Sequence, residues 1–247
     1  MPLVETEAIV LRTHRLGEAD KIASLFTRQL GRVRAVAKGA LSRRGRFGAA
    51  LEPLSYIRLW IYDRENRDLQ RVGSAEILES FFEMQKDYRV QLAGQYLAEV
   101  TERFLPDREV NERVFRLLLA VLRAIKRFGE VNRPLLFFDY WLLRLGGFLP
   151  DLSRCMKCQR QFAEEDGYYD PVAVALVCAQ CRSGPAERIS AQALGLVPAF
   201  RSARIEEWIE DKPAAAGTRE LRRLLEQIIE AHLEKKLATR PLLAEEI

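Results

Sequence analysis

The first eighty residues contain short apolar runs separated by turn residues, a pattern typical of β-strands. The clearest run is residues 56–62, where Ile57, Leu59 and Ile61 alternate with larger or charged side chains. Similar runs occupy residues 8–11, 22–26, 33–37 and 69–78, and glycines or Pro53 lie between them. About five short strands with little helix predict a small closed barrel, for which the five-stranded OB-fold is the obvious candidate.

From about residue 81 the apolar period becomes helical. Leu92, Tyr96, Val100 and Phe104 lie four residues apart, and residues 114–128 follow the three-four spacing of a core-facing helix. Pro106 separates these two helices, and a third apolar helix is predicted over 135–145, ending at Gly146 and Gly147. A short helix capped by Ser190 follows later in the chain. A linker over 212–217 then leads to a last helix that starts at Thr218.

These periods predict an α+β protein with three parts. Residues 1–80 form an OB-fold barrel that binds nucleic acid. Residues 81–150 and 186–247 form a helical domain, into which residues 151–185 are inserted as a zinc-binding module. The longest apolar stretch, 134–150, is interrupted by Asp139 and Arg144, so we interpret it as a buried helix and not as a membrane span.

All four cysteines lie in two CxxC pairs: Cys155 with Cys158, and Cys178 with Cys181. The spacing is that of four-cysteine zinc sites, in which two turns supply a tetrahedral set of thiolates. Four protein ligands leave no open position, so the Zn²⁺ is expected to be structural. Two disulfides and a thioredoxin-like redox pair are the alternatives. The N-terminal residues lack the features of a secretory signal, which favours a reducing, intracellular setting and therefore the metal.

The net charge is +4, and its distribution is uneven. Residues 1–80 contain fourteen Lys or Arg and ten Asp or Glu, whereas the rest of the chain is balanced. Residues 21–51 contain no acidic residue and eight basic ones: Lys21, Arg28, Arg32, Arg34, Lys38, Arg43, Arg44 and Arg46. Charge of one sign over thirty residues predicts a phosphate-rich partner, so these residues are the predicted nucleic-acid-binding site. A solvated surface loop is the alternative.

Three aromatic residues, Tyr56, Trp60 and Tyr62, share one strand face with Arg58. Aromatic rings beside cations suit base stacking against single strands. Large aromatic side chains are mostly buried, so packing against the helices is the favoured interpretation.

Motifs of catalysis are missing from the chain. It has no phosphate-binding loop of the GxxxxGK[ST] type, no HExxH, no GxSxG and no GxGxxG. The two histidines, His14 in a charged turn and His232 at the edge of the last helix, stand alone and are expected to have no site role. The chain is therefore not expected to be an enzyme.

Several short motifs resemble one known family. They are residues 16–20 (LGEAD), Phe26 with Thr27 and Gly31, residues 37–40 (AKGA), residues 51–54 (LEPL), residues 146–150 (GGFLP) and residues 239–242 (TRPL). In this order and spacing the chain is similar to RecO, the bacterial mediator of recombination and repair, over nearly its whole length.

The resemblance implies an N-terminal OB-fold, a helical domain and a zinc module that only some members keep. It also implies binding of single- and double-stranded DNA, annealing of complementary strands, and action with RecR to load a recombinase onto DNA coated by single-strand-binding protein. The expected location is the bacterial cytoplasm, with the nucleoid. Two alternatives stay open: a non-enzymatic protein scaffold, and an RNA-binding factor with a structural zinc.

Overall fold

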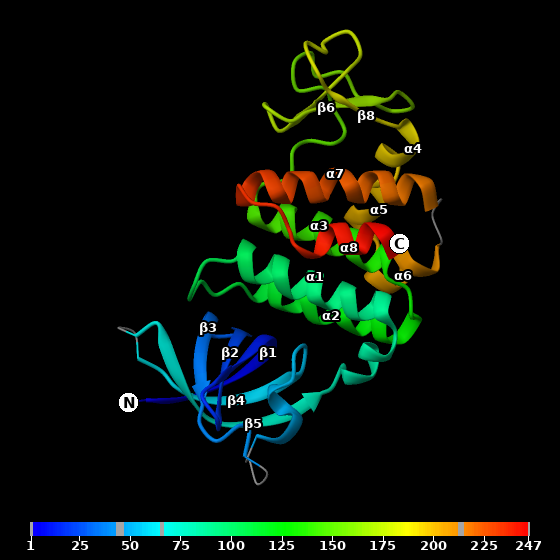
Figure 1. Ribbon diagram of the computed structural model, residues 1–247. Coiled ribbons are helices and arrows are strands. Elements are labelled where there is room, and N and C mark those ends of the chain that lie inside the picture. The colour runs from blue at the N-terminus through cyan, green and yellow to red at the C-terminus, as the bar shows by residue number, and fades with distance from the viewer. Residues whose placement is uncertain (1, 43–46, 65–66, 212–214, 247) are drawn as a thin grey trace. The chain divides into compact units, whose positions relative to one another are not determined.

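The computed structural model describes residues 2–42, 47–64, 67–211 and 215–246 (Figure 1). The chain divides into two compact units. The first comprises the residues up to Leu122 together with Pro241–Glu246, and the second comprises Arg123–Arg240. The division falls within two continuous helices, α2 (Glu112–Phe128) and α8 (Thr239–Glu246).

Five strands of the first unit close into a barrel in the order β1-β2-β3-β5-β4, as expected for an OB-like fold (Figure 1). They are β1 (Leu3–Leu16), β2 (Asp20–Thr27), β3 (Gly31–Ala37), β4 (Tyr56–Tyr62) and β5 (Leu69–Glu79). Neighbouring strands are antiparallel except for β3 and β5, which pair in parallel over three residues. The predicted α+β class with an N-terminal barrel is thereby confirmed.

Strand alternation explains the barrel core. One side of each strand supplies small or branched residues to the interior, among them Ala23, Leu25, Val33, Ile57 and Leu59, all buried. Burying a Val, Leu or Ile side chain contributes about 1.5–3 kcal/mol. The 3₁₀ turn η1 (Gly48–Leu51) adds Ala50 and Leu51 to the same core, so the long β3–β4 connection is packed against the barrel at this point.

The helical segment of the first unit begins with the 3₁₀ turn η2 (Phe82–Lys86) and helix α1 (Tyr88–Phe104). The Asp87 side chain accepts from the Arg89 N–H and caps α1. Leu54, from the β3–β4 connection, lies against Gly94, where any side chain on α1 would overlap it. Pro106 follows the end of α1, as predicted, and α2 begins six residues later.

The second unit is built around α7 (Ala215–Leu233), which packs along α3 (Asn132–Gly146). Three short helices precede α7: α4 (Ala191–Leu194), α5 (Val197–Ser202) and α6 (Ile205–Glu210). A three-stranded sheet in the order β7-β6-β8 lies between α3 and α4 in the chain, with β6 (Gly167–Asp170), β7 (Ala175–Val177) and β8 (Glu187–Ile189). None of the described helices is both long and apolar enough to cross a bilayer.

Helix boundaries confirm some expectations and correct others. Gly147 ends α3 with a φ of +79°, and the Ser190 side chain accepts from Ala193 N–H at the start of α4. The last long helix begins at Ala215 and not at Thr218, so residues 215–217 of the predicted linker are helical, while residues 212–214 lie outside the described residues. Alanine has the highest helix propensity, which extends the helix backwards.

Two strand-level expectations were wrong in detail. His14 lies within β1 and not in a turn, because β1 continues to Leu16 and pairs with β2 up to Asp20. The apolar residues of 172–177 also predict a strand, but the strand is confined to Ala175–Val177. Asp170 Oδ1 accepts from the N–H groups of Val172 and Ala173, which holds residues 171–174 in a turn.

Candidate nucleic-acid interface and metal centre

The register of β1, β2 and β3 arranges outward-facing side chains in rows across the barrel. Two adjacent rows are Arg12, Ser24 and Arg34, and His14, Ile22 and Val36. Arg12 pairs with Glu102 of α1 at 3.0 Å, so helix α1 covers the β1 end of the first row. At the β3 end Arg34 is exposed, and Ile22 and Val36 are half-buried beside it.

Among the predicted cations that the structure describes, Arg34 and Lys38 are exposed on this face. Arg34 lies on β3, and Lys38 directly follows the strand. Together with Ile22 and Val36 they give a surface of cations and apolar side chains over β2 and β3. In OB-folds this strand face and the neighbouring loops receive oligonucleotides.

The β3–β4 connection is fastened beside this face at both ends. Asp20 Oδ1 accepts from the Gly39 N–H at 2.8 Å, and the Leu41 N–H donates to the Ala19 carbonyl at 2.9 Å. Farther along, Glu52 accepts from the Lys21 ammonium at 2.9 Å. Arg43, Arg44 and Arg46 fall within this connection but lie outside the described residues. The motifs at residues 16–20, 37–40 and 51–54 therefore meet where the connection leaves and rejoins the barrel.

Arg28 and Arg32, also predicted to contact nucleic acid, are committed to the protein itself. Arg28 donates to both carboxylate oxygens of Glu112 on α2 and to Glu7 on β1, at 2.6–2.8 Å. Arg32 Nε donates to the Leu105 carbonyl at 3.1 Å, and its Nη2 lies 2.9 Å from Asp107. Lys21 is likewise paired. Three of the predicted cations thus have a structural partner.

The Arg28 contacts shift the ionisation of their partners. Burial by itself would raise the pKa of Glu7, but hydrogen bonds from Arg28 and Tyr56 and the charges of Arg28 and Arg58 lower that pKa overall. The carboxylates of Glu112 and Glu7 raise the pKa of Arg28 in turn. Both groups are therefore charged near neutral pH, and the cluster ties β1, the β2–β3 turn and the start of α2 together.

The aromatic strand face is divided between two roles. The Tyr56 ring meets Phe115 of α2 edge-on, with centroids 6.3 Å apart, so the packing interpretation holds for Tyr56. Trp60 Nε1 donates to Glu5 at 3.2 Å, and both Trp60 and Tyr62 stay half-buried on the barrel. The Arg71 guanidinium lies 5.8 Å from the Tyr62 ring centroid.

Arg71 is a candidate that the sequence pattern did not indicate. It is exposed on β5 and pairs in parallel register with Val36 of β3, so it extends the outward-facing row of His14, Ile22 and Val36. Its position could not be inferred from the run of basic residues at 21–51, because β5 is brought beside β3 by closure of the barrel. Only the strand order reveals this neighbour.

The four predicted metal ligands come together in the second unit. The sulfurs of Cys155, Cys158, Cys178 and Cys181 all lie within 4.8 Å of one another, and none of the four forms a disulfide. Each CxxC pair is a tight turn. Gln159 N–H donates to the Cys155 carbonyl at 2.9 Å, and Cys181 N–H donates to the Cys178 carbonyl at 3.0 Å. The four cysteines are therefore free thiols in the structure, which does not agree with the disulfide alternative.

The electrostatics of the cluster are those of a site for a cation. Burial raises the pKa of Cys155, but backbone N–H groups of Cys158, Cys178 and Lys157 bring it down to about 6. Sulfur contacts from Cys178 and Cys158 raise the pKa of Cys181 to about 12. Without a cation, one thiolate in the cluster opposes ionisation of another.

The residues fit a zinc ion. With Zn–S bonds of about 2.3 Å, the sulfurs of a tetrahedral site are roughly 3.8 Å apart. The Cys158 and Cys178 sulfurs are 3.7 Å apart. Four sulfur donors, with backbone N–H groups directed at the Cys155 sulfur, could hold a metal ion of this kind. The site would supply cross-linking of the two turns, because its four ligands are all protein groups.

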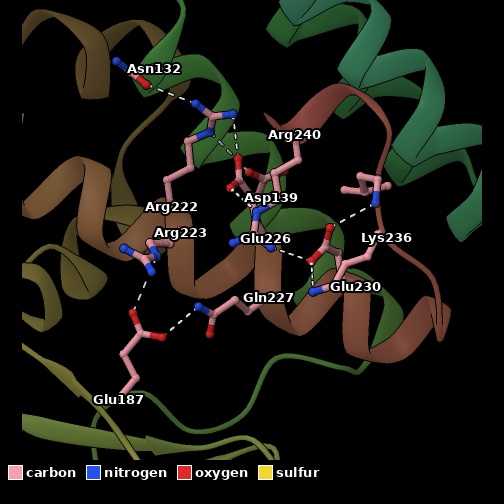
Figure 2. A network of polar contacts seen from close by, with 11 residues as sticks. Asn132, Asp139, Glu187, Arg222, Arg223, Glu226, Gln227, Glu230, Lys236 and Arg240 are labelled. Carbon is pink, nitrogen blue, oxygen red and sulfur yellow. Dashed lines mark hydrogen bonds and ion pairs between the residues drawn. The ribbon is translucent and has the colours of Figure 1, made fainter. Parts of the chain in front are cut away.

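Hydrogen bonds connect the cysteine module to α7 (Figure 2). Glu187 of β8 accepts from Gln227 at 2.7 Å and lies 3.6 Å from the Arg223 guanidinium. Glu220 accepts from the backbone and hydroxyl of Ser190 just after β8. The sheet that carries Cys178 is thereby held on the long helix.

A buried ionic network lies on another side of α7 (Figure 2). The Arg222 guanidinium lies 2.7 Å from Glu226, 3.1 Å from the Asn132 amide oxygen and 3.9 Å from the fully buried Asp139. Arg240 donates to Glu226 at 3.0 Å and also to Glu230. The arginine of the motif at 239–242 therefore stabilises the second unit from within.

Two models of protein families match the chain, and together they cover most of it. The model described as Recombination protein O N terminal matches residues 1–81. The model described as Recombination protein O C terminal matches residues 85–241.

Curated relatives agree with the family models. A protein of Koribacter versatilis named DNA repair protein RecO is 41% identical over 237 residues, which cover 96% of this chain and 96% of the relative. A protein of the same name from a Nocardioides species is 36% identical over 242 residues, covering 95% and 96%. One from an Anaeromyxobacter species is 29% identical over 248 residues, covering 99% and 97%. The likeness therefore extends over both units.

Proposed function

The chain belongs to the RecO family of DNA repair proteins, and from this membership and the geometry of the barrel we propose that it is a DNA-binding mediator of recombinational repair. It binds single- and double-stranded DNA, promotes annealing of complementary strands and, with RecR, helps a recombinase to load onto DNA coated by single-strand-binding protein. It acts without a catalytic step, in the cytoplasm at the nucleoid.

One observation carries the DNA-binding part of the proposal. The outer face of β2 and β3 combines the exposed cations Arg34 and Lys38 with the apolar side chains of Ile22 and Val36. Cations attract the phosphates and release counterions, and apolar side chains can pack against the face of an unstacked base. Arg71 extends the same face, and the connection that carries Arg43, Arg44 and Arg46 begins beside it.

We assign the cysteine cluster a structural role as a Zn²⁺ site. Its four sulfurs and the backbone donors to the Cys155 sulfur support this assignment. The ion would fix the two turns and the β7-β6-β8 sheet, and no step of DNA binding passes through it.

The test is a titration of a labelled single-stranded oligonucleotide by fluorescence anisotropy over a series of salt concentrations. We expect binding that weakens linearly on a log–log plot, with a slope of about −0.7 for each phosphate contacted. No binding at low salt would refute the proposal and favour a protein scaffold. Competition with RNA of the same sequence separates an RNA-binding factor, because RNA readers use the 2′-hydroxyl. Stronger retention of RNA would count against the DNA assignment.

A further inference from the structure

The four cysteines of the second unit differ in their access to solvent. Cys158 is exposed, Cys181 is half-buried, and Cys155 and Cys178 are buried. The two buried residues expose at most 2% of their surface. A dissolved oxidant can therefore reach the Cys158 sulfur from outside, whereas the sulfurs of Cys155 and Cys178 are shielded by the protein.

A second sulfur lies beside the exposed one. The Sγ atoms of Cys158 and Cys178 are 3.7 Å apart. Cys158 belongs to the first CxxC turn and Cys178 to the second, so this contact joins the two turns. It therefore differs from a thioredoxin-like pair, in which both cysteines belong to one CxxC turn. An exposed cysteine next to a second thiol is the arrangement found in redox-sensing cysteines.

The surroundings of Cys158 suit the same chemistry. The preceding residue, Lys157, donates from Nζ to the Cys181 carbonyl at 3.0 Å and to the Ser183 hydroxyl at 2.8 Å. Both acceptors are neutral, so the ammonium brings a positive charge to the two turns. Reactive cysteines occur in partly exposed, electropositive surroundings of this kind. We propose that Cys158 is a site of oxidation by hydroperoxides, and that Cys178 captures the oxidised sulfur as a disulfide.

Hydrogen peroxide is the simplest oxidant of this class, and its reaction with the two thiols balances. The Cys158 sulfur attacks one peroxide oxygen, the O–O bond breaks, and a sulfenic acid and one water are formed. The Cys178 sulfur then attacks the Cys158 sulfur, the S–O bond breaks, and a second water leaves. The two thiols give up two electrons and two protons, which reduce the peroxide and leave in the two waters. Thiol reductants reverse the disulfide by exchange.

The disulfide has a consequence for the proposed Zn²⁺ site. It removes two of the four sulfur ligands, and the other two cannot complete a tetrahedral set by themselves. Oxidation of Cys158 is therefore expected to release the metal while the new bond keeps the two turns linked. The release of metal rests on the proposed zinc site, whereas the pairing of Cys158 with Cys178 rests only on the exposure and contact of their sulfurs.

The test treats the full chain with hydrogen peroxide after the reductant has been removed and the metal content measured. Remaining thiols are alkylated, and the protein is digested with trypsin. Because trypsin cleaves after Lys and Arg, it separates residues 155–157 from 158–160, and both of these from 161–182. The expected product is peptide 158–160 linked to peptide 161–182, with fragmentation placing the bond at Cys178. We expect release of about one metal ion for each disulfide formed.

Two variants test the role of the exposed sulfur. Cys158→His removes the thiol but keeps a metal ligand, because histidine can complete a Cys₃His zinc site. Cys181→His, the matched control, makes the same exchange in the second turn and keeps the pair of Cys158 and Cys178. Under peroxide, Cys158→His is expected to lose metal at least about tenfold more slowly than wild type, because buried cysteines are inert. Cys181→His is expected to form the same disulfide as wild type.

Several results would overturn the inference while the proposed function stands. Wild type could keep all its thiols under excess peroxide, or form a disulfide between any other pair of cysteines. Equal rates of metal release from wild type and Cys158→His would also contradict it. Protein purified without metal would instead count against the proposed zinc site, and the tryptic peptides would still show whether Cys158 pairs with Cys178.

Discussion

Gly31, at the start of β3, shows how closely single residues are determined in the first unit. Its φ is +67°, and an added Cβ would lie 2.7 Å from the Arg108 carbonyl carbon and overlap the Glu109 carbonyl. The Arg108 N–H donates to the Arg32 carbonyl at 2.9 Å at the same place. Glycine is therefore required both by the turn and by the α1–α2 connection that lies against it.

Replacing Gly31 with Ala is expected to destabilise the protein by more than the strain of a positive φ alone. Gly17→Ala is the matched control, because Gly17 has a φ of +64° and an added Cβ there would meet no heavy atom within 4 Å. Gly17→Ala should lower the free energy of unfolding by about 1–2 kcal/mol, and Gly31→Ala should lower it by clearly more. Urea unfolding followed by circular dichroism measures both values. Equal losses of stability in the two variants would show that the α1–α2 connection can move away from the added Cβ of residue 31 at no cost in free energy.

For individual residues of the nucleic-acid interface, the sequence predicted the charge but not the partners within the protein. A run of basic residues in the sequence predicted eight contacts to nucleic acid, but Arg28 and Arg32 are held by Glu112 and Asp107. Their partners lie more than seventy residues away in the chain, so no local pattern announces them. Arg34 could be placed on the outer face, since strand alternation alone puts it opposite the buried Val33 and Ala35.

At the scale of elements, the strands were the most predictable because period-two alternation and turn residues agree. The cysteine pairs were equally clear, since their spacing determines which four sulfurs can meet. Short helices were less predictable. The cap at Ser190 indicated α4, but α5 and α6 are too short to show an apolar period, and Pro198 lies in the first turn of α5.

The cysteine module should depend on its metal. Cys155→Ser is expected to lower the metal content well below one ion per chain and the melting temperature by roughly 5–10 °C, because metal binding and folding are coupled in such sites. Metal content is measured by mass spectrometry of the purified protein. Met156→Ser, a change at the exposed neighbouring position, is the control and should keep the metal. A Cys155→Ser protein with full metal and unchanged melting would contradict the assignment.

Glu230 of helix α7 should make a pH-dependent contribution to the free energy of unfolding. Burial raises the pKa of Glu230, but the Leu237 N–H, Lys236 and Arg240 lower it below its ordinary value overall. A carboxylate whose pKa is lower in the folded state than in the unfolded state stabilises the protein at pH values above the unfolded-state pKa. This stabilisation is lost as the pH falls through the folded-state pKa. Glu230→Gln should therefore cost about 2 kcal/mol at pH 7, and the difference from wild type should shrink below about pH 4.3.

Chemical unfolding at several pH values measures this difference. Glu234→Gln, at an exposed position just after the end of α7, serves as the control and should show little dependence on pH. A Glu230→Gln difference that stays constant from pH 7 to pH 3 would show that the charge of Glu230 does not stabilise the second unit.

At the scale of the whole molecule, family membership and geometry support the same function from independent directions. The family models match residues 1–81 and 85–241, and the barrel places two exposed cations and two apolar residues on the face that OB-folds use for oligonucleotides.

The most direct test of single-strand binding is the salt slope of R34E/K38E beside wild type and beside R201E/R219E, which reverses two exposed cations elsewhere. We predict weaker binding and a slope reduced by at least about 1.4, since each phosphate contact contributes about 0.7 to the single-strand slope. The control should bind as wild type does. Unchanged affinity and slope in R34E/K38E would contradict the assignment of the β2–β3 face as the site for single-stranded DNA.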